Sequence, residues 1–355
     1  MGINLIAPIN DRSYGVVGYN LLKSLYKNGI NVSLFPIGNI FPLPNIDIGL
    51  IRETLDNSEY FNKSDPCIRL WHQFDMTHFV GNGPKIGFTI FEINKFSQKE
   101  KHQLAALDYL IVCSEWAKTV VENEVPSLKN RIIIYQLGVD IDLLPKQNIL
   151  SRGDTYNFVN IGKLEIRKGH DILGAIFNKA FRPDDNVCLN ISWNNPFMSP
   201  EEIQEWQRFY LETDMGRAGK IMFMPWFDNQ ADLFKAIQKM DCGIFPSRAE
   251  GWNLELAECI SLGLPVIATN YSAHTEFCNS KNSYLVDIDT LEPAFDGKWF
   301  HGIGEWAYIG TKQINDFIDK MRFCYDNKIT INNGGYDFSW DGSTKKLITF
   351  LSQLH

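Results

Sequence analysis

Glu250 and Glu258, with seven residues between them, are the residues whose types and spacing most clearly indicate chemistry. An apolar run that predicts a strand ends at Phe245, and the next periodic segment predicts a helix over about residues 253–262. Asn253 is a suitable N-cap, so the free N–H groups and positive dipole end of this helix would face a diphosphate at the carboxyl edge of a sheet. The two carboxylates would flank that diphosphate, because each has two acceptor oxygens that suit vicinal hydroxyls. The predicted binding residues are Glu250, Gly251, Trp252, Asn253, Leu254 and Glu258.

This segment resembles the signature of a known family. The glutamate pair is similar to the paired-glutamate motif of the GT4 family of retaining glycosyltransferases, which have the GT-B fold. Residues 263–268 read Gly-Leu-Pro-Val-Ile-Ala, where that family commonly has G-x-P-V-I-A. A glutamate pair at this spacing also occurs by chance in helices, but the flanking Pro246 and Ser247 favour the family. The resemblance implies that Glu250 is catalytic and reaches the sugar hydroxyls, whereas Glu258 binds the ribose diol of the donor.

A basic segment, residues 160–171, resembles the G-R-L-x-x-x-K-G loop of the same family. When the bond between a sugar and a diphosphate breaks, negative charge develops on the leaving group, and a metal-free site must supply the counter-charge from side chains. The resemblance implies that Lys168 and Lys163 are catalytic, although Lys163 replaces an arginine and lacks its bidentate fork. Arg167 is a further candidate for this contact with the donor. The alternative is a solvated basic loop, and His170 is expected at the surface of a helix start.

The first half of the chain has weaker signals. Its glycine loop lacks the full dinucleotide fingerprint but resembles the first glycine loop of GT4 enzymes, which implies that Gly15 approaches the donor. The alternative is an ordinary strand-to-helix turn. Thr89 and Glu92 resemble a T-x-x-E pattern found in part of the family, which implies an acceptor-side Thr89 and a catalytic Glu92. His72 is a competing acceptor-side candidate, although a histidine beside aromatic residues is more often a core residue.

Other patterns concern the nucleobase and metals. Trp226 follows a predicted strand, so its loop would face the nucleotide and could wall the base, although tryptophan is also a common core residue. Two D-x-D sequences, at 140–142 and 287–289, match the metal signature of the other large glycosyltransferase fold. Neither is placed between donor phosphates. We therefore predict no metal ligands and no cofactor, with a nucleotide sugar as substrate.

The elements that would position these residues alternate between strand and helix twice along the chain. Predicted strands cover residues 3–7, 31–35, 68–70, 85–88, 109–113 and 132–136, and then 156–161, 187–192, 220–224, 242–245 and 265–268. Each series opens with a strand and a glycine-bearing loop, which is how a doubly wound sheet begins. The predicted fold class is α/β, of the GT-B type, with two Rossmann-like domains facing each other across a cleft. Residues 1–150 would form the acceptor-side domain and 151–339 the donor domain, with a helix at about 340–355 packing back on the first.

Composition excludes several classes of protein. A length of 355 residues suits two domains, and a net charge of −8 argues against nucleic acid, which needs a basic surface. Seven cysteines without a C-x-x-C pair predict free thiols in a reducing compartment. No apolar segment approaches the ~20 residues of a membrane span, and the first residues do not resemble a signal peptide. We expect a cytoplasmic protein; peripheral membrane contact has no sequence support.

The motifs together predict a retaining, metal-independent glycosyltransferase. It would move a hexose from a UDP- or GDP-linked sugar to a glycan or other hydroxyl acceptor, as in polysaccharide biosynthesis. One alternative is a nucleotide-sugar epimerase of the same fold, which would convert the donor without an acceptor. The other is a sugar-nucleotide binding module that has lost catalysis. The set of Glu250, Glu258 and Lys168 argues against the module, whereas the lysine at 163 leaves it open.

Overall fold

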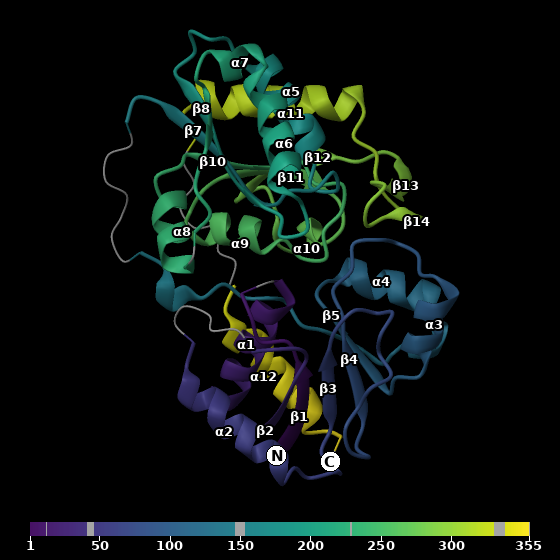
Figure 1. Ribbon diagram of the computed structural model, residues 1–355. Coiled ribbons are helices and arrows are strands. Elements are labelled where there is room, and N and C mark those ends of the chain that lie inside the picture. The colour runs from purple at the N-terminus through teal and green to yellow at the C-terminus, as the bar shows by residue number, and fades with distance from the viewer. Residues whose placement is uncertain (12, 41–45, 146–152, 228, 330–337, 355) are drawn as a thin grey trace. The chain divides into compact units, whose positions relative to one another are not determined.

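The computed structural model describes residues 1–11, 13–40, 46–145, 153–227, 229–329 and 338–354. The chain divides into two compact units, the first of Met1–Asp140 with Asp337–His355 and the second of Ile141–Tyr336. The predicted domain boundary at residue 150 lies outside the described residues. Each unit contains one six-stranded parallel sheet surrounded by helices (Figure 1).

Strands and helices alternate along both units, as the sequence pattern predicts. The first unit contains β1 (Gly2–Ala7), α1 (Ser13–Lys27), β2 (Asn31–Pro36), α2 (Ile48–Glu59), β3 (Cys67–Leu70), β4 (Lys85–Phe88), α3 (Gln98–Ala105), β5 (Tyr109–Val112), α4 (Glu115–Glu124), the 3-10 turn η1 (Pro126–Leu128), β6 (Ile132–Ile134) and α12 (Trp340–Leu351). The second contains η2 (Ile141–Leu143), β7 (Tyr156–Lys163), α5 (His170–Ala180), β8 (Val187–Asn194), α6 (Pro200–Leu211), α7 (Asp214–Arg217), β9 (Ile221–Phe223), α8 (Gln230–Ile237), β10 (Cys242–Phe245), α9 (Leu254–Ser261), β11 (Val266–Asn270), α10 (His274–Phe277), β12 (Ser283–Asp287), β13 (Leu291–Phe295), β14 (His301–Ala307) and α11 (Thr311–Asp326).

The sheet of the first unit has the strand order β2-β1-β3-β4-β5-β6, and all its pairs are parallel. The chain moves outward from β1 to β2 and then returns to the other side of β1, so the order reverses between β1 and β3. Loops that leave the carboxyl ends of strands at such a switch point are where doubly wound sheets bind ligands. In this unit they are the glycine loop after β1 and the aromatic segment after β3.

The sheet of the second unit has the order β12-β11-β10-β7-β8-β9, again fully parallel. Its switch point lies between β7 and β10. The basic segment follows β7 and the first glutamate of the pair follows β10, so the topology brings the two sequence motifs to one sheet edge. The buried faces of these strands pack on an apolar core that includes Phe158, Phe177 and Phe317.

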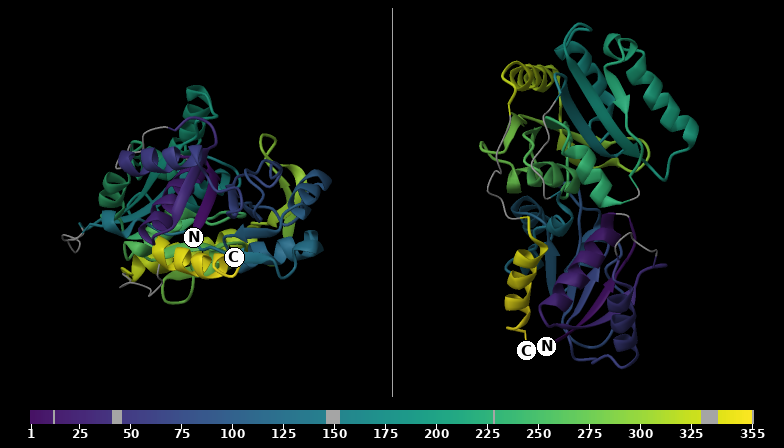
Figure 2. Two further views of the ribbon diagram at one scale, coloured as in Figure 1. Left: turned by 90° about the horizontal axis from the view of Figure 1, so that it is seen from below. Right: turned by 90° about the vertical axis from the view of Figure 1, so that its left-hand side faces the viewer.

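The helix α12 packs against the first unit, where it lies beside α1 (Figure 2). The Ser339 side chain caps its N-terminus by accepting from the Gly342 N–H. The hydroxyls of Tyr135 and Thr344 hydrogen bond at 2.7 Å. Gly138 approaches the helix so closely that a Cβ there would lie 2.5 Å from the backbone nitrogen of Trp340. The helix is therefore fastened to the segment that follows strand β6.

An antiparallel hairpin, β13–β14, pairs with neither large sheet and lies between β12 and α11 in the chain. The sequence pattern did not indicate this hairpin.

All seven cysteines are free thiols, and all except Cys188 are buried. Within the described residues, no helix has both the length and the apolarity needed to cross a membrane.

Candidate functional site

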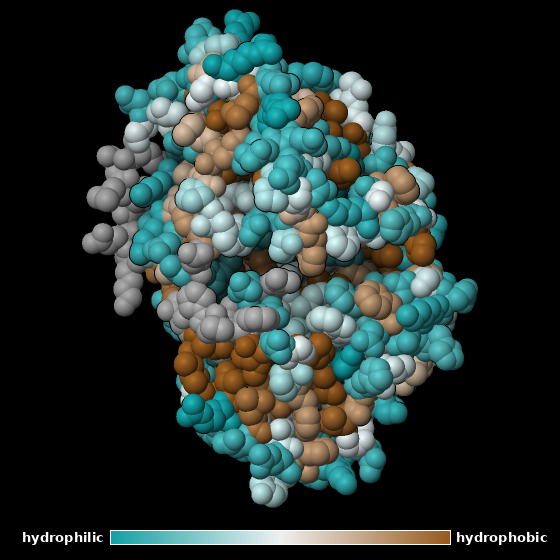
Figure 3. Space-filling view, viewed as in Figure 1, coloured by the Kyte–Doolittle hydropathy of each residue, from teal (hydrophilic) through white to brown (hydrophobic). Residues whose placement is uncertain are grey.

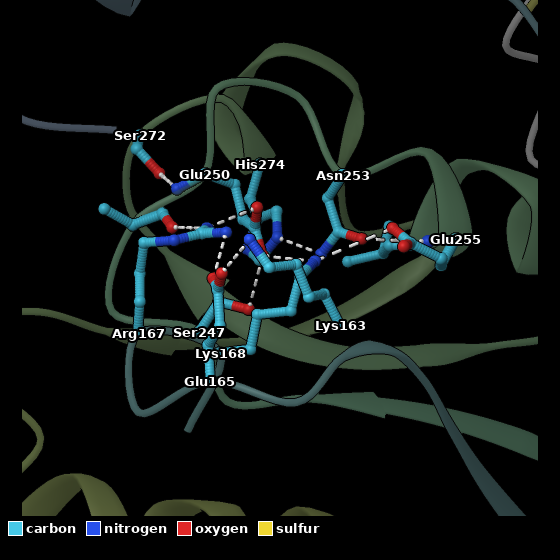
Figure 4. Close-up of polar contacts among 12 residues, drawn as sticks. Lys163, Glu165, Arg167, Lys168, Ser247, Glu250, Asn253, Glu255, Ser272 and His274 are labelled. Carbon is cyan, nitrogen blue, oxygen red and sulfur yellow. Dashed lines mark hydrogen bonds and ion pairs between the residues drawn. The ribbon is translucent and has the colours of Figure 1, made fainter. Parts of the chain in front are cut away.

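Glu250 is the buried centre of a polar cluster at the switch point of the second sheet. Its Oε2 accepts a hydrogen bond from Arg167 at 2.7 Å, and its Oε1 accepts from Lys168 at 3.0 Å and from the Ser247 hydroxyl at 2.9 Å. Its backbone N–H donates to the Ser272 hydroxyl at 2.8 Å. Figure 4 shows Arg167 and Lys168 pointing at this carboxylate from the loop after β7. The side chain of Glu250 is thus held in one orientation by three donors.

The cluster balances cations against carboxylates. Arg167 also contacts Glu165 at 2.8 Å, Lys163 contacts Glu165 at 2.6 Å, and Lys168 lies 3.6 Å from Glu255 in the first turn of α9. The pairing therefore involves three cations, Lys163, Arg167 and Lys168, and three carboxylates, Glu165, Glu250 and Glu255. An arriving diphosphate can compete with these carboxylates for the cations.

The mutual pairing keeps the buried groups ionised. Burial alone would raise the pKa of Glu250, but Arg167 and Lys168 outweigh burial and hold that pKa well below its ordinary range. Burial alone would lower the pKa of Lys168, but the carboxylates of Glu250 and Glu255 raise it above its ordinary value. Glu250 is consequently a weak base, suited to accepting hydrogen bonds and placing charge rather than to abstracting a proton.

His170, at the start of α5, is completely buried, so its predicted surface position is wrong. Its Nδ1 accepts from the backbone N–H of Glu165 and its Nε2 contacts the Asn160 Oδ1, both at 3.0 Å. The Asn160 amide in turn donates to the Ile244 carbonyl at 2.7 Å, which joins β7 to β10. Burial, with a further contribution from Lys168, lowers the pKa of His170 to about 3. The neutral ring therefore fixes the basic segment to the sheet below it.

A second buried histidine, His274, supports the glutamate loop. Its Nε2 accepts from the Asn253 side chain at 2.9 Å, and its Nδ1 lies 3.1 Å from the Thr269 carbonyl. Burial lowers the pKa of His274 to about 4, which keeps this ring neutral as well. Asn253 has φ +84°, a left-handed conformation that asparagine tolerates better than most residues, and its Oδ1 caps Leu256. His274 and Ser272 lie outside the recognised motifs, so sequence reasoning missed both.

Glu258 is buried inside α9, where Gln230 of α8 donates a hydrogen bond to its Oε1. Burial, reinforced by the nearby Glu255 carboxylate, raises the pKa of Glu258 to about 8. The group is therefore largely protonated at neutral pH. A ribose diol at this position would meet one hydroxyl donor and one acceptor oxygen, rather than the two acceptors that sequence reasoning assumed.

We expect the Glu258→Gln variant to unfold at a higher temperature than the wild type in alkaline buffer and at nearly the same temperature at pH 5. The folded-state pKa of about 8 exceeds the ordinary 4.5, so the wild type loses stability as pH rises from 4.5 to 8. At about 1.4 kcal/mol per pKa unit, the gain of the variant at pH 9 has an upper bound of roughly 3–5 kcal/mol. Thermal unfolding at pH 5, 7 and 9 measures it. The exposed Glu205→Gln change should give no such pH-dependent difference, and an equal gain at all three values would contradict the protonated Glu258.

The remaining predicted site residues of the second unit differ in how far they are buried. Gly251 and Trp252 are buried, Leu254 is half-buried, and Trp252 packs on Phe277 at 4.8 Å between ring centroids. Lys163 ends β7 and is partly exposed. Trp226, proposed for the nucleobase, is 52% exposed in the loop after β9.

Candidate residues of the first unit gather at its own switch point. Gly15, in the first turn of α1, lies so close to the preceding loop that a Cβ would be 2.5 Å from the Asn10 backbone nitrogen. The adjacent Tyr14 hydroxyl donates to the Ile90 carbonyl at 2.7 Å, which brings the glycine loop to the segment after β4. The rings of Tyr14 and His72 are 4.6 Å apart.

Thr89 and Glu92 lie in that segment after β4. Thr89 is buried and its hydroxyl lies 3.4 Å from Gln73 Oε1, while Glu92 is half-buried. The structure therefore brings Gly15, His72, Thr89 and Glu92 to one edge of the first sheet.

The D-x-D sequences occupy different surroundings. Asp140 pairs with Lys23 at 3.3 Å, Asp289 pairs with Lys312 at 2.5 Å, and Asp287 accepts from Asn270 at 2.8 Å. Among the residues that the structure describes, no group of three or more histidine, cysteine or acidic side chains is arranged to hold a metal ion.

Solved structures with the same architecture identify the fold. Sucrose-phosphate synthase from Thermosynechococcus elongatus matches with a TM-score of 0.70 at 14% identity, covering 99% of this chain and 98% of the other. The HepE protein of Anabaena, solved with UDP and glucose, matches with a TM-score of 0.69 at 14% identity, covering 99% and 100%. The two parallel six-stranded sheets with their helices are those of the GT-B fold.

Sequence comparison finds similarity to glycosyltransferases in the second unit. Residues 155–296, which carry the whole polar cluster, match the family model described as glycosyl transferases group 1. An uncharacterised glycosyltransferase of Methanocaldococcus jannaschii is 28% identical over 174 residues, or 46% of this chain and 40% of that protein. The α-1,3/1,6-mannosyltransferase ALG2 of Yarrowia lipolytica is 23% identical over 255 residues, or 62% and 55%. The chain thus spans about half the length of these curated relatives, and its residues 155–296 are similar to the group 1 glycosyltransferases.

Proposed function

We propose that this chain transfers a hexose from a nucleoside diphosphate to a hydroxyl of a glycan or other acceptor, with retention of anomeric configuration and without a divalent metal. The observation that carries the proposal is the buried Glu250, held between Arg167 and Lys168 at the switch point of the second sheet. The family match covers these residues.

The arrangement suits the breaking of a sugar–diphosphate bond. Arg167 and Lys168, with Lys163 beside them, supply positive charge where the leaving diphosphate becomes more negative, and preorganised charge of this kind is a large contribution to catalysis. Glu255 lies close to Lys168, so donor binding would exchange one anionic partner of that lysine for another. Glu258 lies within α9 and Asn253 caps its N-terminus, and the nucleoside of the donor would bind beside this helix.

The state of Glu250 supports the proposal of a retaining transfer. Its carboxylate oxygens already accept from Arg167, Lys168 and Ser247, and its pKa is well below the ordinary range, so it is a poor nucleophile and a poor base. We propose that an oxygen of the departing phosphate takes the acceptor proton on the face from which the bond breaks. The new bond then forms on that same face.

Ligand-induced stabilisation identifies the donor. We expect one sugar nucleotide among UDP-, GDP- and ADP-linked hexoses to raise the unfolding temperature in the presence of EDTA; UDP-glucose and a mannose nucleotide are the first probes, because the HepE structure contains UDP and glucose and ALG2 is a mannosyltransferase. A ligand at about 100 times its dissociation constant adds roughly 2.7 kcal/mol, a shift of several degrees. The Glu258→Ala variant should lose this shift.

Turnover then separates the candidate functions. Transfer to an acceptor sugar in EDTA, with a product whose anomeric proton coupling matches that of the donor, supports the proposal. Conversion of the donor sugar without an acceptor would indicate an epimerase, and tight donor binding without turnover would indicate a binding module. An inverted product would falsify the retaining mechanism.

A further inference from the structure

The ammonium of Lys163 packs against two aromatic rings that also contact each other. Its Nζ lies 5.2 Å from the ring centroid of Phe197 and 5.2 Å from that of Trp299, within cation–π range, and the two rings are 5.1 Å apart. Both rings are well exposed, Phe197 by 50% and Trp299 by 43%.

Trp299 is held in place by the turn of the β13–β14 hairpin. The Asp296 carboxylate accepts from the backbone N–H groups of Lys298, Trp299 and Phe300 at 2.7–2.9 Å. Apolar side chains lie at the surface in the region of β13 and β14 (Figure 3). The turn is therefore structured, and it presents its tryptophan to the end of β7.

The base of the hairpin is joined to the basic segment by a second route. Glu292 accepts from the buried Trp306 indole and from Arg248, each at 3.2 Å. Arg248 forms a bidentate pair with Asp171, both contacts at 2.8 Å, and donates to the Ile166 carbonyl at 2.6 Å. The hairpin and the loop that carries Arg167 and Lys168 therefore form one continuous structure.

Phe197 is fixed in a similar way by the segment that follows β8. Its backbone N–H donates to Asn195 Oδ1 at 3.0 Å, and the buried Asn195 amide donates to the Leu164 carbonyl at 2.8 Å, next to Lys163. Both rings are thus positioned relative to the end of β7 by hydrogen bonds between polar side chains and the backbone.

Two aromatic rings affect a lysine ammonium differently from a carboxylate. A lysine side chain is flexible and carries a point charge, unlike the planar fork of arginine. Aromatic faces attract the ammonium and restrict its position without cancelling its charge, so it stays available for an anion. Glu165, the anionic partner of Lys163, is also paired with Arg167, so it keeps a cation when Lys163 turns to a ligand.

We propose that Phe197 and Trp299 are positioning residues for Lys163: they hold its ammonium where it contacts the diphosphate of the donor, and the β13–β14 hairpin is thereby a functional part of the donor site. This inference rests on the proposed function. It also accounts for a lysine at this position, because the two rings supply the orientation that a guanidinium fork would provide by itself.

Inorganic pyrophosphate is the probe, because it reports on the phosphate site whatever the base or sugar. We expect Lys163→Met to weaken pyrophosphate binding about tenfold and Trp299→Leu to weaken it about threefold to fivefold in titration calorimetry. The double variant should bind no more weakly than Lys163→Met, because the ring acts only through the ammonium. Trp299→Phe should bind pyrophosphate nearly as well as the wild type. Phe295 lies on the same hairpin and is 61% exposed, and Phe295→Leu should have no effect on pyrophosphate binding.

A second measurement tests the geometry without any ligand. After reductive methylation with ¹³C-formaldehyde, the Lys163 methyl resonance, assigned by its absence in Lys163→Arg, should be shifted upfield by the two rings and should return toward the usual position in Trp299→Leu. An ordinary resonance in the wild type would overturn the inference.

The binding results distinguish failure of the aromatic positioning of Lys163 from failure of the proposed function. If pyrophosphate binds the wild type and depends on Lys163 but not on Trp299, the aromatic positioning is wrong and the proposed function stands. If Trp299→Leu costs the same factor with and without Lys163, the ring acts independently of the lysine and the inference is also wrong. If the wild type binds neither pyrophosphate nor any sugar nucleotide, both proposals fail.

Discussion

The Glu250→Gln variant should lose turnover by roughly 10²–10³-fold, the usual cost of removing one preorganised charged partner from a reacting centre. It should also lose stability, because Arg167 and Lys168 are buried and would keep only Glu165 and the more distant Glu255 as anionic partners. Removing one member of a buried ion pair typically costs about 3–5 kcal/mol. Initial rates with saturating donor and chemical unfolding measure the two effects separately.

The pH dependence of this loss has a defined sign. The native pKa of Glu250 is depressed, so its stabilising contribution is present above the ordinary value of 4.5 and declines as pH falls below that value. The stability difference between wild type and variant should therefore be largest near pH 7 and shrink in acid. The exposed Glu212→Gln change is the control. A folded variant with wild-type turnover would remove Glu250 from the mechanism.

The Gly169→Ala variant should be among the most destabilised single-methyl changes in this protein. Gly169 has φ +76°, which costs a residue with a Cβ about 1–2 kcal/mol, and the new Cβ would lie 2.1 Å from the Pro246 carbonyl oxygen. Since Pro246 belongs to the glutamate loop, relief of this clash must separate that loop from the basic segment. We expect a total loss above about 3 kcal/mol and nearly complete loss of activity.

Gly219 separates these two contributions. It has φ +70° in the same unit, but nothing lies within 4 Å of the Cβ position. Gly219→Ala should therefore cost only the conformational strain, about 1–2 kcal/mol, and leave turnover unchanged. Comparable losses for the two variants in urea unfolding would show that the close approach of the two loops is unimportant.

The sequence predicted the fold well where local signals agreed with topology. The series of apolar runs predicted every strand of both large sheets except β12, and the helix expected over about residues 253–262 corresponds to α9 with Asn253 as its N-cap. The family resemblance indicated Glu250, Lys168 and Arg167. The topology explains why these residues lie together, because loops that follow β7 and β10 meet at the switch point of the sheet.

Residues that act through tertiary contacts were not predictable in the same way. His170 looked like a polar helix start, but its ring fills a buried position between Glu165 and Asn160. Trp299 lies far from the basic segment in the sequence, in a hairpin that no periodic pattern indicated. The raised pKa of Glu258 depends on Glu255 and on burial, neither of which spacing alone reveals.

The position of α12 has a consequence for the order of events on the ribosome. The segment after strand β6 lacks its contacts with residues 340–351 until those residues are translated, which happens only after the whole of the second unit. At ~5–20 residues per second, the roughly two hundred intervening residues delay completion of the first unit by about 10–40 s. The second unit, which is continuous in sequence, can close first. Vectorial synthesis therefore leaves the earlier-made half of this protein exposed to chaperones and proteases for longer than the later-made half.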